Sequence, residues 1–301
     1  MKTNTINLIG HRGICLYKIV ENTLPALEKA LEAGFLIETE VQKIKDGYVL
    51  YHDKVIPGPN DFELSERSKE HTVFETQEGS GFYLPSGKKP ITECTLDELL
   101  NKIQFNKEKH ELALSTHAAE KVHLDLTEAP RIATLGELIS LLKKFPDSKT
   151  FLEIKRSNIY IDYNDGAEEE IIGMLKDNDL IKNVIINTSS VNSLRHVRKA
   201  NVNIALSVDT DFIEGHPDLA HDRDEALKIK EELGISFWNP PFWATDEKLL
   251  EDFQKIGLEI AAWTQFENKK EEINEIKRLV SIGLKYMFTN QAEEIKKIIT
   301  D

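Results

Sequence analysis

The sequence lacks the features that mark disulfide-rich, secreted or membrane-embedded proteins. Its 301 residues include two cysteines, Cys15 and Cys94, which are too few for a disulfide framework or a zinc site. No apolar run approaches the ~20 residues that a membrane-spanning helix needs. The first residues, MKTNTINLIGHRG, lack the long apolar segment and small-residue cleavage site of a secretory signal. We therefore expect a cytoplasmic protein with reduced thiols and no membrane partner.

Positive charge is also scarce. Lys and Arg number 38 against 52 Asp and Glu, which gives a formal net charge of −14. Such an acidic chain disfavours a nucleic-acid partner and electrostatic docking on anionic lipid. A phosphate-bearing substrate would therefore need local positive charge from a bound cation and from a few basic side chains.

What remains is the composition of an ordinary globular protein. Hydrophobic residues make up 40% and charged residues 30%, and the chain is long enough to bury a sizeable core in one barrel domain. From residue 132 onward, helical patterns alternate with short apolar strands, which predicts a parallel sheet with right-handed crossovers. With two N-terminal strands, the predicted strands lie at 6–10, 36–41, 150–155, 184–188, 203–208, 235–239, 258–263 and 286–289. This arrangement predicts an α/β fold of the TIM (β/α)8 barrel type, and an open doubly wound sheet is the alternative.

The alternation breaks after the second strand. Residues 41–53 form two predicted strands around Lys45-Asp46-Gly47, a turn in which we expect glycine to supply a positive φ. From 54 to 131 the periodicity degrades, apart from a short predicted helix at 95–103 and a strand at 121–126. An insertion of this size between barrel strands two and three is more often a lid or substrate collar than filler. We therefore expect a single domain over 1–301 with a loop-rich insertion at 54–131.

Two pairs of charged residues share one spacing at the ends of predicted strands. Side chains at positions i and i+2 of a strand point to the same face, so Glu38 and Glu40 converge, as do Glu153 and Lys155. At the C-terminal end of a barrel, this face is where functional groups gather. Three glutamates there would repel one another unless a cation lay among them, and oxygen ligands suit Mg²⁺ or Ca²⁺, with Mn²⁺ also compatible. The alternative is that two of the glutamates form surface ion pairs.

Two histidines also follow apolar runs. His11 precedes Arg12 and Gly13, which offer bidentate contact to a phosphate and close backbone approach, respectively. His52 precedes Asp53, which is a candidate to orient the imidazole, although adjacent strand residues face opposite ways. A histidine pair beside a cation can supply a general base and a general acid near neutral pH. We therefore expect His11 and His52 to be catalytic.

These residues lie in segments that resemble the glycerophosphodiester phosphodiesterase family. The segment Ile9-Gly10-His11-Arg12-Gly13, followed by Glu21-Asn22-Thr23, resembles the first motif of that family, and ETEVQKIKDGYVLYHD resembles the second. ATLGELISLL followed by FLEIK resembles the third, and AAWT at 261–264 and FTN at 288–290 resemble the last two. The resemblance covers most of the chain, and the family carries a variable insertion where residues 54–131 lie.

The resemblance implies a TIM barrel that binds a divalent cation and hydrolyses a small glycerophosphodiester to glycerol 3-phosphate and an alcohol. It also implies a place in glycerol and lipid metabolism. The residues that fall on the family's positions are Glu38, Glu40 and Glu153 for the cation, His11 and His52 for acid–base chemistry, and Arg12 and Lys155 for phosphate contact. Either histidine can serve as the acid or the base, and attack by a substrate hydroxyl or by water is compatible with the sequence.

The sequence departs from the family pattern in three places. Glu40 stands where the family usually has Asp, and the added methylene is large beside the ~0.5 Å tolerance of a working site. The usual Arg-Thr-Thr after the second histidine is replaced by residues 54–58, and a usual Ser-Phe pair appears as Ser189-Ser190. We expect these changes to affect the cation and the substrate more than the type of reaction.

Aromatic residues near two late strands are candidates for the pocket wall. Trp263 ends a predicted strand where the family has a Trp close to the substrate, so we expect it to contact substrate. For Trp238, Phe242 and Trp243, packing in the core is the favoured interpretation. A choline head group would suit an aromatic wall through cation–π attraction.

Two other functions fit parts of the sequence. A barrel that binds phosphate-bearing ligands without turnover would be consistent with Glu40 and the altered loop, yet both histidines and all three glutamates remain. A metal-dependent sugar isomerase could use the same fold but would need no arginine for phosphate. A small-molecule phosphodiester substrate is therefore the leading hypothesis.

Overall fold

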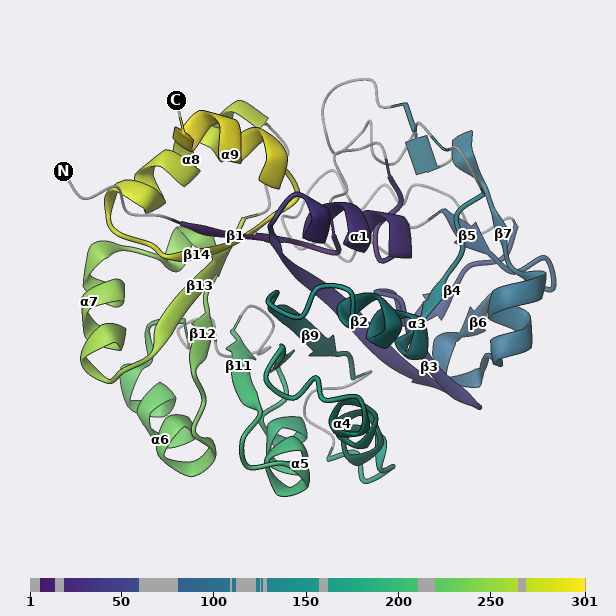
Figure 1. Cartoon of the computed structure of the whole chain (residues 1–301), viewed down its shortest axis with the longest axis horizontal. Helices are drawn as coiled ribbons and strands as arrows, with labels where there is room; N and C mark the ends of the chain where they lie inside the picture. The colour runs from purple at the N-terminus through teal and green to yellow at the C-terminus, as the bar shows by residue number, and fades with distance from the viewer. Residues whose placement is uncertain are drawn as a thin grey trace.

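The computed structural model describes residues 6–13, 19–59, 81–108, 110–111, 123–124, 126, 129–156, 162–210, 220–264 and 269–300. Within these residues, eight parallel strands close into a barrel, because β1 pairs with both β14 and β2 (Figure 1). In chain order the strands are β1 (Asn7–Gly10), β2 (Leu36–Ile44), β9 (Thr150–Ile154), β10 (Val184–Thr188), β11 (Ala205–Asp209), β12 (Phe237–Asn239), β13 (Glu259–Trp263) and β14 (Tyr286–Thr289). This closure confirms the TIM barrel and rules out the open sheet.

Helices surround the barrel (Figure 1). They are α1 (Leu24–Glu32), α3 (Leu135–Leu142), α4 (Ala167–Asp177), α5 (Val191–Ala200), α6 (Arg223–Leu233), α7 (Glu247–Lys255), α8 (Lys269–Ser281) and α9 (Ala292–Thr300), with a short 3-10 turn η5 (Phe242–Ala244). The helix α3 shows why they form, since Thr134 and Glu137 make a capping box and the helix buries Leu135, Leu138 and Leu142 at helical spacing.

The strand β2 continues past the barrel into a hairpin with β3 (Gly47–Leu50), which pairs in turn with β8 (Ala133–Thr134). The predicted turn is confirmed, since Ile44 pairs with Gly47 across Lys45 and Asp46. The expectation that Gly47 supplies a positive φ is wrong, because this residue is not among the described glycines of positive φ. Its role is close packing: a Cβ at Gly47 would lie 3.1 Å from Cδ1 of Leu96.

The described parts of the insertion form a small substructure at one side of the barrel (Figure 1). It contains β4 (Val55–Ile56) paired with β6 (Lys89–Pro90), β5 (Phe82–Tyr83) paired with β7 (Gln104–Phe105), and the short helices η2 (Ile91–Glu93) and η3 (Glu98–Lys102). A separate buried cluster that includes Ile56, Leu84 and Leu99 holds it together. The helix predicted at 95–103 is confirmed, with hydrogen bonds of the π type. The strand predicted at 121–126 lies largely outside the described residues, and the division of the chain at 54–131 stays a prediction.

A layer of apolar side chains fills the barrel below its C-terminal end. Phe151 meets Phe237 and Phe288 edge to face, with ring centroids 5.2 and 5.1 Å apart. Ile9, Ile185 and Ala261 complete this layer. Residues two positions further along the same strands point to the same face, so the layer forms a floor under whatever side chains follow it.

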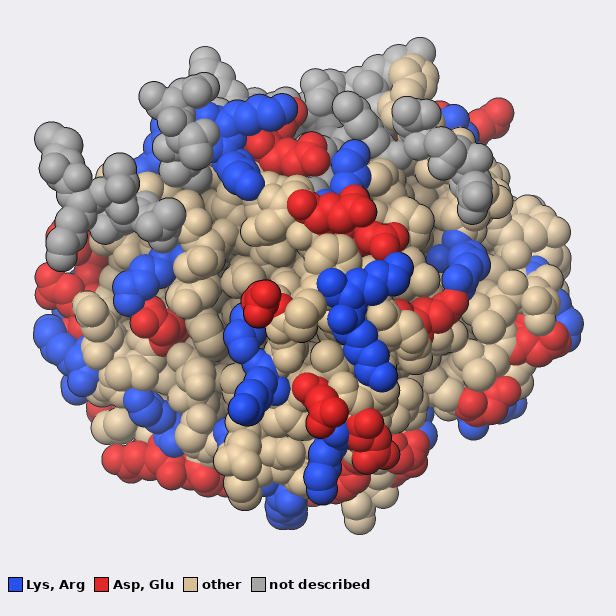
Figure 2. Space-filling model, viewed as in Figure 1, with Lys and Arg blue, Asp and Glu red and all other residues tan. Residues whose placement is uncertain are grey.

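The surface is mixed in charge. On the face shown in Figure 2, Lys and Arg lie beside Asp and Glu, so no large patch of one sign appears there. Among the described residues, no helix is long and apolar enough to cross a membrane.

Candidate active site

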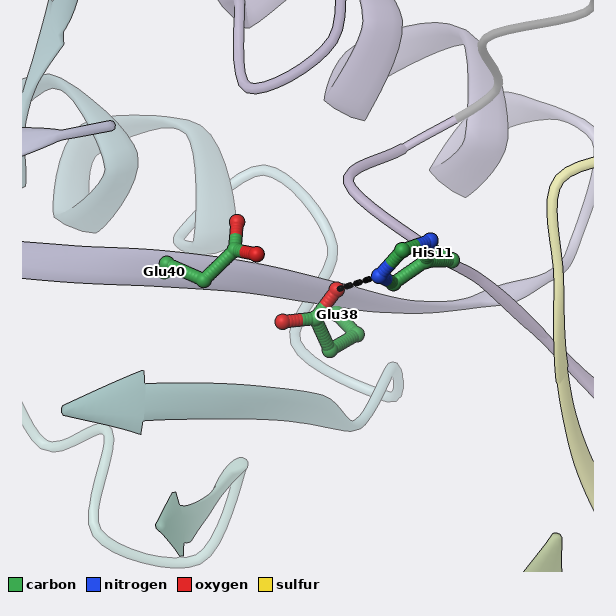
Figure 3. Close-up of side chains that lie close together, drawn as sticks. All are labelled: His11, Glu38 and Glu40. Carbon is green, nitrogen blue, oxygen red and sulfur yellow. Dashed lines mark ion pairs between the residues drawn. The ribbon is translucent and has the colours of Figure 1, made fainter. Parts of the chain in front are cut away.

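The side chains above the apolar floor are polar. Two positions beyond Ile9, Phe151 and Phe288 come His11, Glu153 and Asn290, and β2 adds Glu38 and Glu40 on the same side of the strand (Figure 3). Glu153 is the register partner of Glu40, which confirms that carboxylates from two strands meet at one level of the barrel. The structure thus brings the predicted residues of the first three barrel strands together at the C-terminal end.

The turn after β1 is tight and depends on glycine. Gly13 has a φ of +90°, and a Cβ on it would lie 2.7 Å from the carbonyl carbon of Ala26 in α1. Arg12 itself has a φ of 55°, a left-handed conformation that is uncommon for a residue with a side chain. The turn therefore brings the backbone at Gly13 into close contact with α1, and the backbone N–H of Arg12 points toward Glu38 of β2.

Arg12 is held by carboxylates on three sides. Its backbone N–H donates to Oε2 of Glu38 at 3.0 Å, its Nε donates to Oε1 of Glu40 at 2.9 Å, and its guanidinium donates to Oε1 of Glu21 at 2.9 Å. The sequence suggested a bidentate contact of Arg12 with phosphate, and the structure shows that two carboxylates already orient the guanidinium. Glu21 was part of a recognised motif, but its ion pair with Arg12 was not foreseen.

Glu40 has a partner on each oxygen. Oε1 accepts from Arg12, and Oε2 accepts from Nδ2 of Asn22 at 2.6 Å, while Asn22 is itself held by the hydroxyl of Thr39 at 2.7 Å. Burial would raise the pKa of Glu40, but the charges of Arg12 and His52 hold it below its ordinary value. Glu40 therefore remains ionised, and its longer side chain is fixed by hydrogen bonds.

Glu38 differs from Glu40 in having an oxygen without a partner. Its Oε2 accepts from the backbone of Arg12, but its buried Oε1 has no hydrogen-bond partner among the described residues. Burial and the charges of Glu40 and Glu153 raise the pKa of Glu38 well above its ordinary value. A buried carboxylate oxygen without a donor costs free energy unless a cation binds it.

Glu153 and Lys155 converge, as their spacing predicted, and form an ion pair with 3.0 Å between Nζ and Oε1. Burial nevertheless raises the pKa of Glu153 to about 7, and the charges of Glu40 and Asp209 act in the same direction. Lys155 remains charged, because Glu153 and Glu40 outweigh the effect of burial on its pKa. The basic side chain is therefore placed beside the carboxylates, as expected.

The two histidines are each tied to an oxygen through Nδ1. Nδ1 of His11 lies 2.8 Å from Oδ1 of Asn290, and Nδ1 of His52 lies 2.8 Å from Oδ1 of Asp53. Burial, with the charge of Arg12, lowers the pKa of His11 to about 4 and that of His52 well below its ordinary value. Residues 52 and 53 follow the end of β3, so the opposite facing of strand neighbours does not apply and Asp53 contacts the imidazole.

One group of described side chains has the geometry of a cation site. Single ligand atoms of His11, Glu38 and Glu40 all lie within 4.8 Å of one another (Figure 3). Nε2 of His11 is 4.0 Å from Oε2 of Glu38, and Glu38 lies between His11 and Glu40 in the view. Glu153, which the sequence also assigned to the cation, is outside this group and is bound to Lys155. A hard cation with oxygen ligands fits the partnerless oxygen of Glu38.

Aromatic side chains lie on β13 and just after β12 at this end of the barrel. Trp263 packs edge to face on Trp243, with ring centroids 5.3 Å apart, and its buried Nε1 has no partner among the described residues. Trp238 is fully buried, as expected, but core packing is wrong for Trp243, which is 63% exposed. Trp243 lies in the turn η5, after the end of the short strand β12, so it is not part of the barrel sheet.

Several polar residues of this end were not predicted. Three of them lie on β10, β11 and β12, close to the apolar floor: Asn187, Ser207 and Asn239. Nδ2 of Asn239 donates hydrogen bonds to Oδ1 of Asn187 and to the hydroxyl of Ser207. Asp209 ends β11, and its charge acts on Glu153. Asn187, Ser207 and Asn239 lie two positions beyond Ile185, Ala205 and Phe237, which belong to the apolar floor or pack against it, and this spacing is a signal that could have identified them.

Comparisons with known proteins agree with this geometry. The model of the glycerophosphoryl diester phosphodiesterase family matches residues 11–294. A glycerophosphodiester phosphodiesterase of Caldanaerobacter subterraneus subsp. tengcongensis is 26% identical over 297 residues, which is 97% of each chain.

Solved structures share the fold. A structure from Silicibacter pomeroyi DSS-3 has a TM-score of 0.74 at 17% identity and covers 99% of this chain and 94% of its own. An Oleispira antarctica phosphodiesterase in complex with the product sn-glycerol-3-phosphate has a TM-score of 0.65 at 18% identity, and the match covers 99% and 98% of the two chains.

Proposed function

Because the chain belongs to the glycerophosphoryl diester phosphodiesterase family, and is thus a phosphodiesterase, we propose that it releases glycerol 3-phosphate from a small glycerophosphodiester, using a divalent cation and two histidines. The observation that carries the proposal is the buried oxygen of Glu38, which has no hydrogen-bond partner among the described residues and lies in a group with His11 and Glu40. The charges of Glu153 and Arg12 act on Glu38, and those of Arg12, Lys155 and His52 act on Glu40. The product named in the Oleispira antarctica complex supports the choice of substrate.

The cation would be held by Glu38, Glu40 and Glu153. Glu38 offers a free oxygen, and the oxygens of Glu40 and Glu153 each have a further lone pair beyond the hydrogen bonds they accept. An oxygen donor set favours Mg²⁺ or Ca²⁺, with Mn²⁺ also compatible. When bound, such a cation polarises the non-bridging phosphate oxygens.

The chain's own residues supply the remaining chemistry. Arg12 and Lys155 flank the glutamates and neutralise charge on the phosphoryl oxygens, which is most valuable where water is excluded. One histidine takes the proton of the attacking hydroxyl while the other protonates the leaving oxygen. Trp263 lies across the barrel end, where the alcohol part of the diester would extend. The cytoplasmic location and the role in glycerol and lipid metabolism stay predictions from the sequence.

Substrate turnover is the first test. Purified protein would be incubated with glycerophosphodiesters of different alcohols, first in EDTA and then with Mg²⁺, Ca²⁺ or Mn²⁺ restored, and glycerol 3-phosphate would be measured. We expect release that EDTA abolishes and a cation restores. Cation binding without release from any diester would contradict the proposal and favour a barrel that only binds phosphate-bearing ligands.

The cation ligands need a separate test, because His11 meets the same distance criterion as Glu38 and Glu40. Isothermal titration with Mn²⁺ would be compared for Glu153→Gln and His11→Gln. We expect Glu153→Gln to weaken Mn²⁺ binding by about 10-fold or more and His11→Gln to leave it within about threefold while abolishing turnover. The reverse pattern would make His11 a ligand and remove it from the acid–base pair.

A further inference from the structure

Asn290 contacts the imidazole of His11 but has no role in the proposed reaction so far. It follows β14, two positions beyond Phe288 in the apolar floor, and its Oδ1 lies 2.8 Å from Nδ1 of His11. The pairing of β1 with β14 brings these two residues together, and the backbone N–H of His11 donates to the carbonyl of Thr289 at 3.1 Å. Asn290 is therefore fixed against one edge of the imidazole by the closure of the barrel.

The chemistry of this contact determines where the imidazole carries its proton. An amide oxygen can only accept a hydrogen bond, so Nδ1 of His11 must donate. A neutral imidazole that is protonated at Nδ1 has its lone pair on Nε2. Nε2 is the nitrogen that faces Glu38, at 4.0 Å from Oε2. In the opposite tautomer, Nε2 would carry a hydrogen and could not accept a proton from a substrate.

We propose that Asn290 is a positioning residue that holds His11 in the Nδ1–H tautomer, so that Nε2 of His11 is the atom that takes the proton of the attacking hydroxyl. In that step the O–H bond breaks, an Nε2–H bond forms, and the electron pair left on oxygen forms a new bond to phosphorus. The P–O bond to the alcohol breaks, and the leaving oxygen keeps its electron pair until it is protonated. The inference rests on the proposed function for the identity of the substrate, but the tautomer itself does not depend on it. His52, whose Nδ1 lies 2.8 Å from Oδ1 of Asp53, is left as the donor to the leaving oxygen, a role that it can fill only as the imidazolium, which the ionised carboxylate of Asp53 would stabilise.

The tautomer can be read directly by nuclear magnetic resonance. In protein labelled with ¹⁵N histidine, protonated and unprotonated ring nitrogens resonate in separate ranges, and the signals of His11 are identified by their loss in His11→Gln. We expect Nδ1 of His11 to be protonated and Nε2 to be unprotonated in the wild-type protein without cation. A protonated Nε2 and a bare Nδ1 would overturn the proposal, because the amide of Asn290 would then be turned to donate.

Variants at residue 290 test the consequence. Asn290→Ala removes the acceptor, whereas Asn290→Asp keeps an oxygen at the same distance from Nδ1. We expect Asn290→Ala to lower kcat about 10- to 100-fold with KM within about threefold, and to show both tautomers of His11. Asn290→Asp is expected to restore the Nδ1–H tautomer and most of kcat. The matched control is Asn203→Ala, an exposed asparagine before β11, for which no change is expected.

These measurements separate the inference from the proposed function. Wild-type protein with the Nδ1–H tautomer and no turnover of any diester would support the role of Asn290 and contradict the substrate assignment. An unchanged tautomer and unchanged kcat in Asn290→Ala, in an enzyme that does hydrolyse diesters, would contradict the role of Asn290 alone.

Discussion

Two groups of charged side chains meet the end of β9, and they differ in how completely their charges are paired. Lys155 points into the barrel and joins the site cluster, which we define as Arg12, Glu38, Glu40, Glu153 and Lys155. The next residue, Arg156, points outward and forms the Arg156 cluster with Asp165, Glu168 and Ser193. Neighbouring residues of one strand end thus serve two charge networks.

The Arg156 cluster is complete. Arg156 donates to both oxygens of Asp165, at 3.1 and 3.2 Å, and to both oxygens of Glu168, one of which also accepts from the hydroxyl of Ser193. The side chains of Arg156 and Glu168 are 6% and 1% exposed, so their burial matches that of the site cluster.

In the site cluster, by contrast, three glutamates face two basic side chains, and one oxygen of Glu38 has no partner among the described residues. Burial of charge is common to both clusters, so the incomplete pairing of Glu38 is the feature that points to a bound cation.

The largest effect is expected when the unpaired oxygen is removed. Glu38→Gln should lower kcat/KM by at least ~10³-fold, because it deprives the cation of its free carboxylate oxygen. The same change should not lower the melting temperature measured in EDTA, because the raised pKa of Glu38 favours the neutral acid when no cation is bound, and glutamine is also neutral and has nearly the same shape. Glycerol 3-phosphate release and thermal denaturation measure the two effects. The control is Glu28→Gln, which alters an exposed carboxylate paired with Lys144. A strong loss of stability in Glu38→Gln would show that the site is as complete as the Arg156 cluster.

The Arg156 cluster should respond in the opposite sense. Arg156→Met leaves Glu168 buried with Ser193 as its remaining side-chain partner among the described residues. Breaking a buried pair in this way costs about 3 kcal/mol of unfolding free energy. The folded fraction should keep its kcat, since the cluster lies outside the barrel. Urea denaturation gives the stability, and Arg195→Met is the matched control. Its ion pair with Glu232 is exposed, so a loss of less than ~1 kcal/mol is expected. Equal losses in the two variants would mean that the Arg156 cluster contributes no more than a surface pair.

The sequence predicted the strands that carry the site better than the hydrogen bonds between its side chains. Each barrel strand begins within two residues of its predicted start, because apolar runs and helical periodicity are properties of short segments. The i+2 spacing likewise paired Glu38 with Glu40 and Glu153 with Lys155, and the predicted barrel brought the two pairs to the same end. Asn290 was not assigned a role, because it lies 279 residues from His11 and only the closure of the barrel joins them.

Other misses have local causes that a periodic pattern does not contain. Trp243 follows a strand of three residues, so its ring lies outside the core although the segment around it is strongly apolar. Gly47 reads as a turn glycine, but the reason for glycine is the approach of Leu96 from the insertion. Asp53 contacts His52 because the strand has ended, and strand ends are the least certain feature of a sequence pattern.

The smallest expected effect is the dependence of stability on pH. The pKa of an aspartate beside the site cluster is raised, whereas that of an aspartate in the Arg156 cluster is lowered. Burial raises the pKa of Asp53, beside the site cluster, to about 7, and the charge of Glu21 acts in the same direction. Since the folded pKa is above the unfolded one, the folded state binds more protons between pH 4 and 7, and stability falls as pH rises through that window. The contribution of Asp53 to the unfolding free energy in EDTA should therefore decrease by about 2 kcal/mol from pH 5 to pH 7. Asp53→Asn should remove this part of the decrease and leave the part due to Glu153, whose pKa is also about 7.

Asp165 of the Arg156 cluster is the counterpart. Burial opposes its ionisation, but the hydrogen bonds from Arg156 hold its pKa below the ordinary value. Its contribution to stability is therefore present above the unfolded pKa and is lost only as pH falls through the lower, folded pKa. Asp165→Asn should leave the slope between pH 5 and 7 unchanged and flatten the curve at more acidic pH. Urea denaturation of both variants over pH 3 to 8 makes the comparison, and the same slope in Asp53→Asn as in the wild type would show that Asp53 is already ionised when the cation is absent.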